Sequence, residues 1–195
     1  MKNLFLPRFT LLLGLLLWVF PVWAADDAQS YMKARHTEIT ALVTSNAPKP
    51  QLTTAFDALL DYDALAQNSL DMEWSKLSVE QRTEFQDLLK VLVQRAYTKN
   101  IRDTLNFAVE FKGEVDAPNG KLVKTLAKHK TDQHRDPIAI DYVVSNASGK
   151  WKVRDIVTEG SSLVSNYRNQ FRKIIDKQGY AGLIEKMKKK AAEPA

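Results

Sequence analysis

The chain has 195 residues, and its 28 lysines and arginines against 23 aspartates and glutamates give a formal charge of +5 at pH 7. It contains no cysteine, which excludes disulfides, thiolate zinc sites and cysteine nucleophiles, and its three histidines argue against a histidine-built metal site. With 45% hydrophobic and 26% charged residues the composition is that of a globular protein, and so small a charge does not indicate a nucleic-acid partner.

The N-terminus is predicted to be a targeting segment rather than part of the folded domain. Two basic residues precede an almost wholly apolar run over residues 9–20, Pro21 ends the run, and Ala24 offers a cleavage site. This order is typical of a secretory signal peptide, and the run is shorter than the ~20 residues of a membrane anchor. We therefore expect residues 1–24 to be a signal peptide and residues 25–195 to form one exported domain. A cysteine-free exported domain fits the bacterial periplasm.

The first half of this domain is predicted to be helical. Apolar side chains recur at helical spacing over residues 28–45, 52–60 and 64–70. A longer helix should begin at Ser78, where Ser78 and Gln81 form a capping-box pattern, and should end near residue 100.

The apolar spacing then changes from about 3.6 residues to two, which predicts strands. The strands are expected over residues 105–111, 122–130, 138–144 and 151–157, and the short connections between them indicate antiparallel pairing. Gly113 and the Asn119-Gly120 pair are interpreted as turn residues between the first two strands.

A final helix should begin after an N-cap at Ser161 or Ser162, be interrupted at Gly179 and end in a lysine-rich stretch over residues 186–190. Such lysines usually form a solvated helix end, although an anionic lipid surface is an alternative partner. Helices, an antiparallel meander and further helices define an α+β fold: a curled antiparallel sheet of about four strands with helices on one face.

No catalytic constellation is recognisable. The sequence lacks a GxSxG elbow, an HExxH helix and a glycine-rich phosphate loop. The histidines lie among charged residues on separate predicted elements, and the aspartates near residue 60 lack the spacing of a calcium loop. We expect neither an enzyme nor a metal or cofactor site.

One carboxylate stands out, because alternation places Asp155 on the same face as Trp151 and Val153. A buried carboxylate needs a partner. Arg168 is the nearest cationic candidate along the chain, so we predict a structural pair between Asp155 and Arg168. The alternative is a general acid or base poised by burial.

Residues 151–171, WKVRDIVTEGSSLVSNYRNQF, closely resemble the signature of the MlaC, or toluene-tolerance, family. The family pattern is a tryptophan strand ending in Asp-Val, followed by Glu-Gly-x-Ser-Leu and Asn-Tyr-Arg-x-Gln-Phe. Residues 74–85 and 174–184 are also similar to family segments. The chain departs from the pattern at Ser161, where a branched apolar residue is usual, and before Trp74, where a Leu-Gly pair is expected.

The resemblance implies a monomeric periplasmic carrier that binds phospholipid acyl chains in a hydrophobic pocket. Members of the family shuttle phospholipid between an outer-membrane lipoprotein complex and an inner-membrane ABC transporter, which maintains outer-membrane lipid asymmetry. One branch is associated with hopanoids, so a hopanoid or another hydrophobic ligand is an alternative. No cofactor beyond the bound lipid is implied.

The pocket is expected to be dry, with the lipid headgroup at a basic mouth. Two acyl chains of about fifteen methylenes each gain roughly 24 kcal/mol on leaving water, at about 0.8 kcal/mol per methylene. The inward positions of the strands and one stripe of the long helix are the candidate lining, with ordinary core as the alternative for each of them. These residues are Leu105, Phe107, Val109, Phe111, Ile138, Ile140, Tyr142, Trp151 and Val153 from the strands, and Phe85, Leu89, Leu92 and Tyr97 from the helix.

Two functions of other classes remain as alternatives. A small periplasmic hydrolase or isomerase could use Asp155 or Glu159, although neither carboxylate has a companion base or nucleophile in the sequence. An interaction module could instead bind a protein segment in its grooves.

Overall fold

The computed structural model describes residues 27–193, so the predicted signal peptide lies outside the described residues. The helical first half is close to expectation, and the capping box is confirmed, because the Ser78 side chain accepts from the Gln81 amide while the Gln81 side chain accepts from the Ser78 amide. The elements are α1 Ala28–Thr44, α2 Lys49–Leu59, α3 Tyr62–Leu70, the 3₁₀ turn η1 Asp71–Lys76, α4 Val79–Asn100 and the 3₁₀ turn η2 Ile101–Asn106.

The second half forms a five-stranded antiparallel sheet in the order β1-β2-β3-β4-β5, so every strand pairs with its neighbour along the chain. The predicted α+β fold is confirmed, with a fifth strand of only two residues added to the expected four. The strands are β1 Phe107–Ala117, β2 Gly120–His129, β3 Ile138–Ser145, β4 Lys152–Thr158 and β5 Ser161–Ser162, and α5 Leu163–Ala192 completes the chain.

Two local predictions about the first strand are wrong. Leu105 lies in η2 rather than in a strand, because the 3₁₀ turn continues α4 to Asn106. Gly113 does not make a turn but lies within β1, at a register shift between Phe111 and Gly113. A bulge of this kind bends a strand and increases its twist. The glycine therefore curls the sheet instead of ending the strand.

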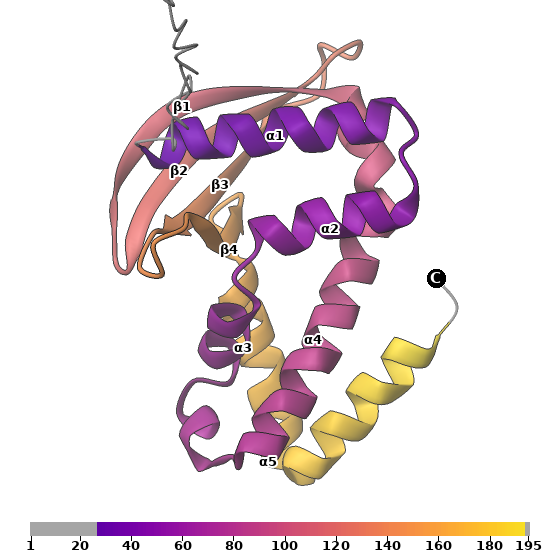
Figure 1. Cartoon of the computed structure of the whole chain (residues 1–195), viewed down its shortest axis with the longest axis vertical. Helices are drawn as coiled ribbons and strands as arrows, with labels where there is room; N and C mark the ends of the chain where they lie inside the picture. Colours follow the sequence, from indigo (N-terminus) through magenta and orange to yellow (C-terminus); the bar gives the residue numbers. More distant parts are fainter. Residues whose placement is uncertain (1–26, 194–195) are drawn as a thin grey trace, which may run out of the picture.

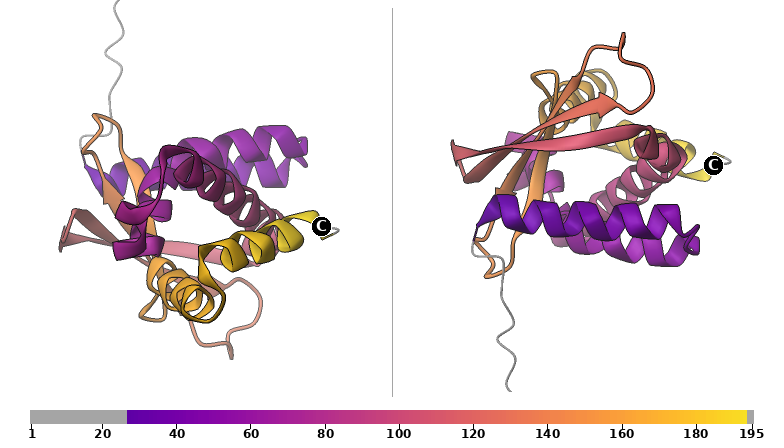
Figure 2. Two further views of the ribbon diagram at one scale, coloured as in Figure 1. Left: turned by 90° about the horizontal axis from the view of Figure 1, so that it is seen from below. Right: turned by 90° about the horizontal axis from the view of Figure 1, so that it is seen from above.

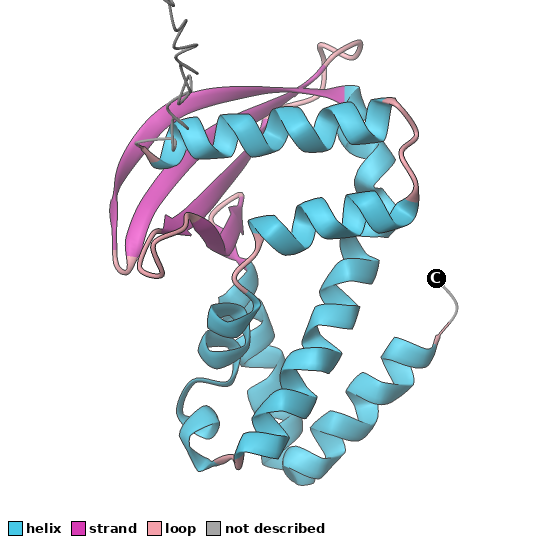
Figure 3. Ribbon diagram, viewed as in Figure 1, coloured by secondary structure: helices cyan, strands magenta, loops and turns pink. Residues whose placement is uncertain are grey.

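The helices cover the concave side of this curled sheet and extend beyond one end of it (Figures 1 and 3). Helix α1 crosses β1 and β2, α3 and α5 continue from the β4 end, and α4 lies beside α3 and α5 and leads through η2 into β1 (Figures 1 and 2). Helix α5 doubles back at Gly179, whose φ of 69° and ψ of 178° are not helical. Phe85, Leu89 and Leu183 form a fully buried core where these helices meet. None of the helices within residues 27–193 combines the length and apolarity needed to cross a membrane.

The close approach of β2 to β3 requires glycine at position 120. Gly120 has a φ of 155°, and a Cβ there would lie 2.1 Å from the Val144 carbonyl oxygen. We expect Gly120→Ala to lower the free energy of unfolding by more than about 2 kcal/mol, because the backbone of the ladder must move. Gly149 is the control: its φ of 76° also favours glycine, but a Cβ placed there would meet no other part of the described chain within 4 Å. Gly149→Ala should cost about 1 kcal/mol, and equal losses in urea unfolding would contradict this account.

Candidate functional site

A cavity of about 480 Å³ lies between the helices and the concave face of the sheet. Among residues 27–193, every lining side chain from α2, α4, α5 and the sheet is apolar or aromatic, and the polar lining residues come from α1 and η2. The apolar and aromatic lining consists of Met32 and Ile39 of α1, Ile101 of η2, and Phe56, Leu59, Leu60, Leu65, Val93, Ala96, Tyr97, Phe107, Val109, Ala127, Ile138, Ile140, Tyr142, Val153, Ile156, Leu163 and Tyr167.

The strands face the cavity with alternate residues, as the period of two requires. Phe107 and Val109 line it, whereas Ala108 between them is exposed on the other side of the sheet. Tyr142 lies deep in the wall, and its burial, together with the nearby Asp141 carboxylate, raises the pKa of its hydroxyl to about 12. The wall therefore carries no charge at neutral pH.

The polar side chains mark the mouth of the cavity between α1 and η2. Asp103 and Thr104 of η2 are exposed, while Arg35 and His36 of α1 are half-buried. Burial lowers the pKa of His36, and the charge of Lys130 lowers it further, so the imidazole is neutral at pH 7. The mouth thus presents the Arg35 guanidinium, which pairs with Glu38 at 2.7 Å, and the Asp103 carboxylate, so it is more mixed in charge than the basic mouth expected from the sequence.

The structure brings about half of the predicted lining residues together. Those that line the cavity are Tyr97, Phe107, Val109, Ile138, Ile140, Tyr142 and Val153. Those that do not are Phe85, Leu89, Leu92, Leu105, Phe111 and Trp151.

Each predicted residue that does not line the cavity has another place in the fold. Phe85 lies in the helical core, where its ring meets Phe171 edge to face with 5.5 Å between centroids. Phe111 is covered by α1, because the His36 ring packs edge-on against it at 6.0 Å. The others occupy different places: Leu89 lies in the same core as Phe85, Leu92 lines a groove between α4 and α5, Leu105 lies in η2, and Trp151 precedes β4 and packs against the core.

The lining residues on α1, α2 and α5 were missed by the sequence reasoning. Met32 and Ile39 lie two helical turns apart on α1, so their spacing carried a usable signal. Tyr167 lies one helical turn after Leu163 on α5, and both residues line the cavity.

The predicted pair between Asp155 and Arg168 is wrong. The Asp155 carboxylate accepts hydrogen bonds from the Ile156 amide at 2.8 Å, the Val164 amide at 3.1 Å and the Ser162 hydroxyl at 2.5 Å. Unpaired amides at the start of a helix are ready donors, and the first turn of α5 lies directly beside this carboxylate. The partner that burial requires is therefore local backbone rather than a distant cation.

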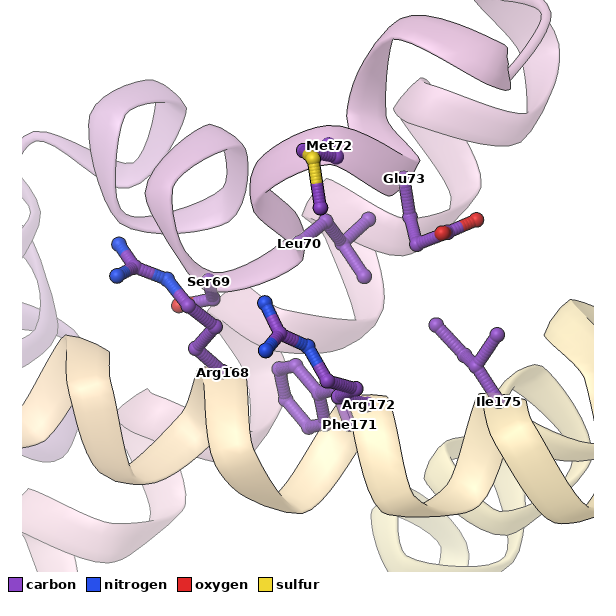
Figure 4. Close-up of a pocket in the computed structure, with 8 residues that line it drawn as sticks. All are labelled: Ser69, Leu70, Met72, Glu73, Arg168, Phe171, Arg172 and Ile175. Atoms are coloured by element: carbon purple, nitrogen blue, oxygen red, sulfur yellow. The ribbon is translucent and has the colours of Figure 1, made fainter.

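Arg168 instead points from α5 toward the turn between α3 and η1, beside a small hollow that Arg172 also borders (Figure 4). The Arg168 Nε donates to the Asn68 carbonyl oxygen at 2.9 Å and lies 3.9 Å from an Asp71 carboxylate oxygen. Asp71 has a φ of 54°, a strained position for a residue other than glycine, and both arginines neutralise it there. These side chains join α5 to α3.

Glu159, the other carboxylate considered for catalysis, also bonds to backbone. Its carboxylate accepts from the Ala139 amide, and its own amide donates to the Ala139 carbonyl at 3.0 Å. Asp155 thus ties β4 to the start of α5, and Glu159 ties the turn after β4 to β3. Among residues 27–193, no group of three or more histidine, aspartate or glutamate side chains is placed to hold a metal ion.

In this architecture an open antiparallel sheet and its helices enclose an apolar cavity. A phospholipid-binding protein from Ralstonia solanacearum, solved in complex with a phospholipid, has the same fold. The two structures superpose with a TM-score of 0.74 at 25% sequence identity, over 85% of this chain and 97% of that one.

The chain belongs to the MlaC protein family, whose pattern matches residues 24–189. It is 25% identical over 176 residues to the intermembrane phospholipid transport system binding protein MlaC of Haemophilus influenzae, covering 88% of this chain and 80% of that protein. It is 23% identical over 197 residues to the toluene tolerance protein ttg2D of Pseudomonas putida, covering 90% and 91%. The family resemblance of the sequence is confirmed.

Proposed function

We propose that this protein is a periplasmic phospholipid carrier that holds acyl chains in the cavity beneath the sheet. The observation that carries the proposal is the uncharged, apolar and aromatic wall of a 480 Å³ cavity whose polar residues are confined to the mouth. This volume is within the range of about 300–1,000 Å³ found for ligand pockets. A related fold holds a phospholipid in the Ralstonia structure.

The wall accounts for affinity without specific polar contacts. Each methylene that leaves water for such a surface contributes about 0.8 kcal/mol, so chain burial dominates binding. The headgroup then lies at the mouth near Arg35 and Asp103, where water remains accessible. Binding that rests on apolar burial resembles burial in a bilayer, and this similarity allows a lipid to leave at either membrane.

A carrier also needs no catalytic group, and we infer that the protein is not an enzyme. The carboxylates of Asp155 and Glu159 accept hydrogen bonds from backbone amides, which supports a structural role for both. The ligand is the phospholipid itself, without a metal or a further cofactor.

The route of the lipid is proposed from the family. The relative from H. influenzae is named as the binding protein of an intermembrane phospholipid transport system. We infer that this chain is exported through residues 1–24 and that residues 25–195 act as one lipid-binding domain. It would exchange lipid with an outer-membrane complex and an inner-membrane ABC transporter, and so maintain lipid asymmetry.

Extraction of the purified protein with organic solvent, followed by mass spectrometry, tests the ligand. We expect about one phospholipid per chain after expression in a Gram-negative host. A hopanoid in place of phospholipid would keep the carrier function but change its cargo. A protein that emerges empty and does not take up lipid from vesicles would overturn the proposal.

A further inference from the structure

A second hollow of about 720 Å³ lies between α4 and the two arms of α5, residues 163–178 and 180–192. We call it the α4–α5 groove. Among the described residues, it shares Ala96 and Tyr167 alone with the lining of the sheet cavity.

The floor and the rim of this groove differ sharply in chemistry. Phe171, Leu183 and Met187 are buried at its floor, each at most 5% exposed. The exposed cations on its rim are Lys49, Lys99, Lys186 and Lys190, which we call the rim lysines, and Glu193 places one exposed carboxylate beside them. None of the rim lysines forms an ion pair within residues 27–193, although Lys188 on the same helix pairs with Glu84 at 2.6 Å.

Arg95 bridges α4 and the end of α5 at one end of the groove. Its guanidinium donates to the carbonyl oxygens of Lys190, Ala191 and Glu193, at the end of α5. At the other end the Tyr180 hydroxyl donates to the Gln81 carbonyl at 2.7 Å, and α4 and the second arm of α5 converge there (Figure 1). Hydrogen bonds therefore bridge α4 and the second arm of α5 at both ends of the groove.

We propose that the α4–α5 groove binds a single-chain anionic amphiphile, with its acyl chain on the apolar floor and its acidic headgroup among the rim lysines. Unpaired cations above an apolar surface complement that chemistry, because the head gains charge-assisted contacts while the chain leaves water. A helix of a partner protein, about 10 Å across, would need a trough open at both ends. The proposal adds a second ligand to the proposed function. It does not depend on phospholipid binding in the sheet cavity.

A fatty acid and a lysophospholipid share this chemistry, and calorimetry at low salt separates them. Laurate and a lauroyl lysophosphatidylglycerol are titrated into the purified protein in separate experiments, with monolaurin as the uncharged analogue. We expect at least one of the two anionic lipids to bind more tightly than monolaurin and to weaken with added salt. Equal affinity for monolaurin would overturn the proposal.

Paired substitutions on one helix locate the site. Lys186→Gln with Lys190→Gln removes two rim lysines and should weaken binding of the anionic lipid by about tenfold or more. Lys188→Gln with Lys189→Gln removes the same charge from residues that do not line the groove, and should change affinity less than about twofold. The same loss in both pairs would show a diffuse charge effect and overturn the assignment.

A substitution that fills the α4–α5 groove tests whether the anionic amphiphile and the phospholipid bind at different sites. Ile174→Trp places a large side chain in the α4–α5 groove, and should abolish binding of the anionic amphiphile without lowering the co-purified phospholipid. If a charge at Val109 of the sheet cavity abolished laurate binding while the rim variants left it unchanged, the amphiphile would belong to the sheet cavity. That result would overturn the second site and leave the phospholipid carrier intact.

Discussion

Val109→Asp is expected to empty the sheet cavity, lowering the co-purified phospholipid by about tenfold or more. The side chain of Val109 faces the cavity from β1, so the new carboxylate would meet acyl chains instead of water. Burying an unpaired carboxylate against a hydrocarbon chain costs several kcal/mol, and 1.4 kcal/mol already corresponds to a tenfold change in affinity. Solvent extraction and mass spectrometry of the purified variant measure the lipid per chain.

The neighbouring Ala108 provides a matched control. Ala108 is exposed on the opposite side of the same strand, so Ala108→Asp introduces the same charge one residue away without reaching the cavity. The Ala108 variant should retain its phospholipid. Circular dichroism and thermal unfolding of both lipid-free variants establish that each is folded. Equal retention of lipid by both folded variants would place the acyl chains elsewhere.

Local patterns were sufficient to predict most of the fold. Ser78 and Gln81 define the start of α4 within four residues, and alternating apolar residues identify β3 and β4 because each has one face toward the interior. The prediction for residues 105–106 failed because it depended on where the helical backbone after α4 ends. Residues 105–106 have the alternation of a strand, yet the 3₁₀ turn after α4 extends through them, and periodicity over so few residues does not decide between the two.

The site was harder to predict because the sequence indicates which residues face inward but not what fills the space in front of them. Phe107, Val109 and Phe111 share one face of β1, but α1 covers Phe111 and leaves the other two open to the cavity. The same limit applies to α4, where Phe85 packs on α5 and Tyr97, twelve residues later, reaches the cavity. Crossing angles and helix ends decide these outcomes, and they are set by tertiary contacts.

The Asp155 carboxylate illustrates how burial can be anticipated while its partner is not. Alternation predicted a buried carboxylate, and the structure shows a half-buried one bonded to two amides and a hydroxyl. Proximity in sequence favoured Arg168. A helix that begins beside the strand instead offers unpaired backbone amides, and bonding to them does not require a long side chain to lose conformational entropy. Asp155 therefore couples three features that the fold needs in one place: β4, β5 and the first turn of α5.

Asp155→Ala is accordingly expected to lower the free energy of unfolding by about 3 kcal/mol, because it leaves the Ile156 and Val164 amides and the Ser162 hydroxyl without their acceptor. Asp155→Asn keeps one oxygen and should lose about 1 kcal/mol. Urea unfolding of Asp155→Ala, Arg168→Gln and the double variant then distinguishes local bonding from the pair predicted by sequence. Since the two side chains have separate partners, their losses should add within about 0.5 kcal/mol, whereas a coupling above about 1 kcal/mol would restore the ion pair.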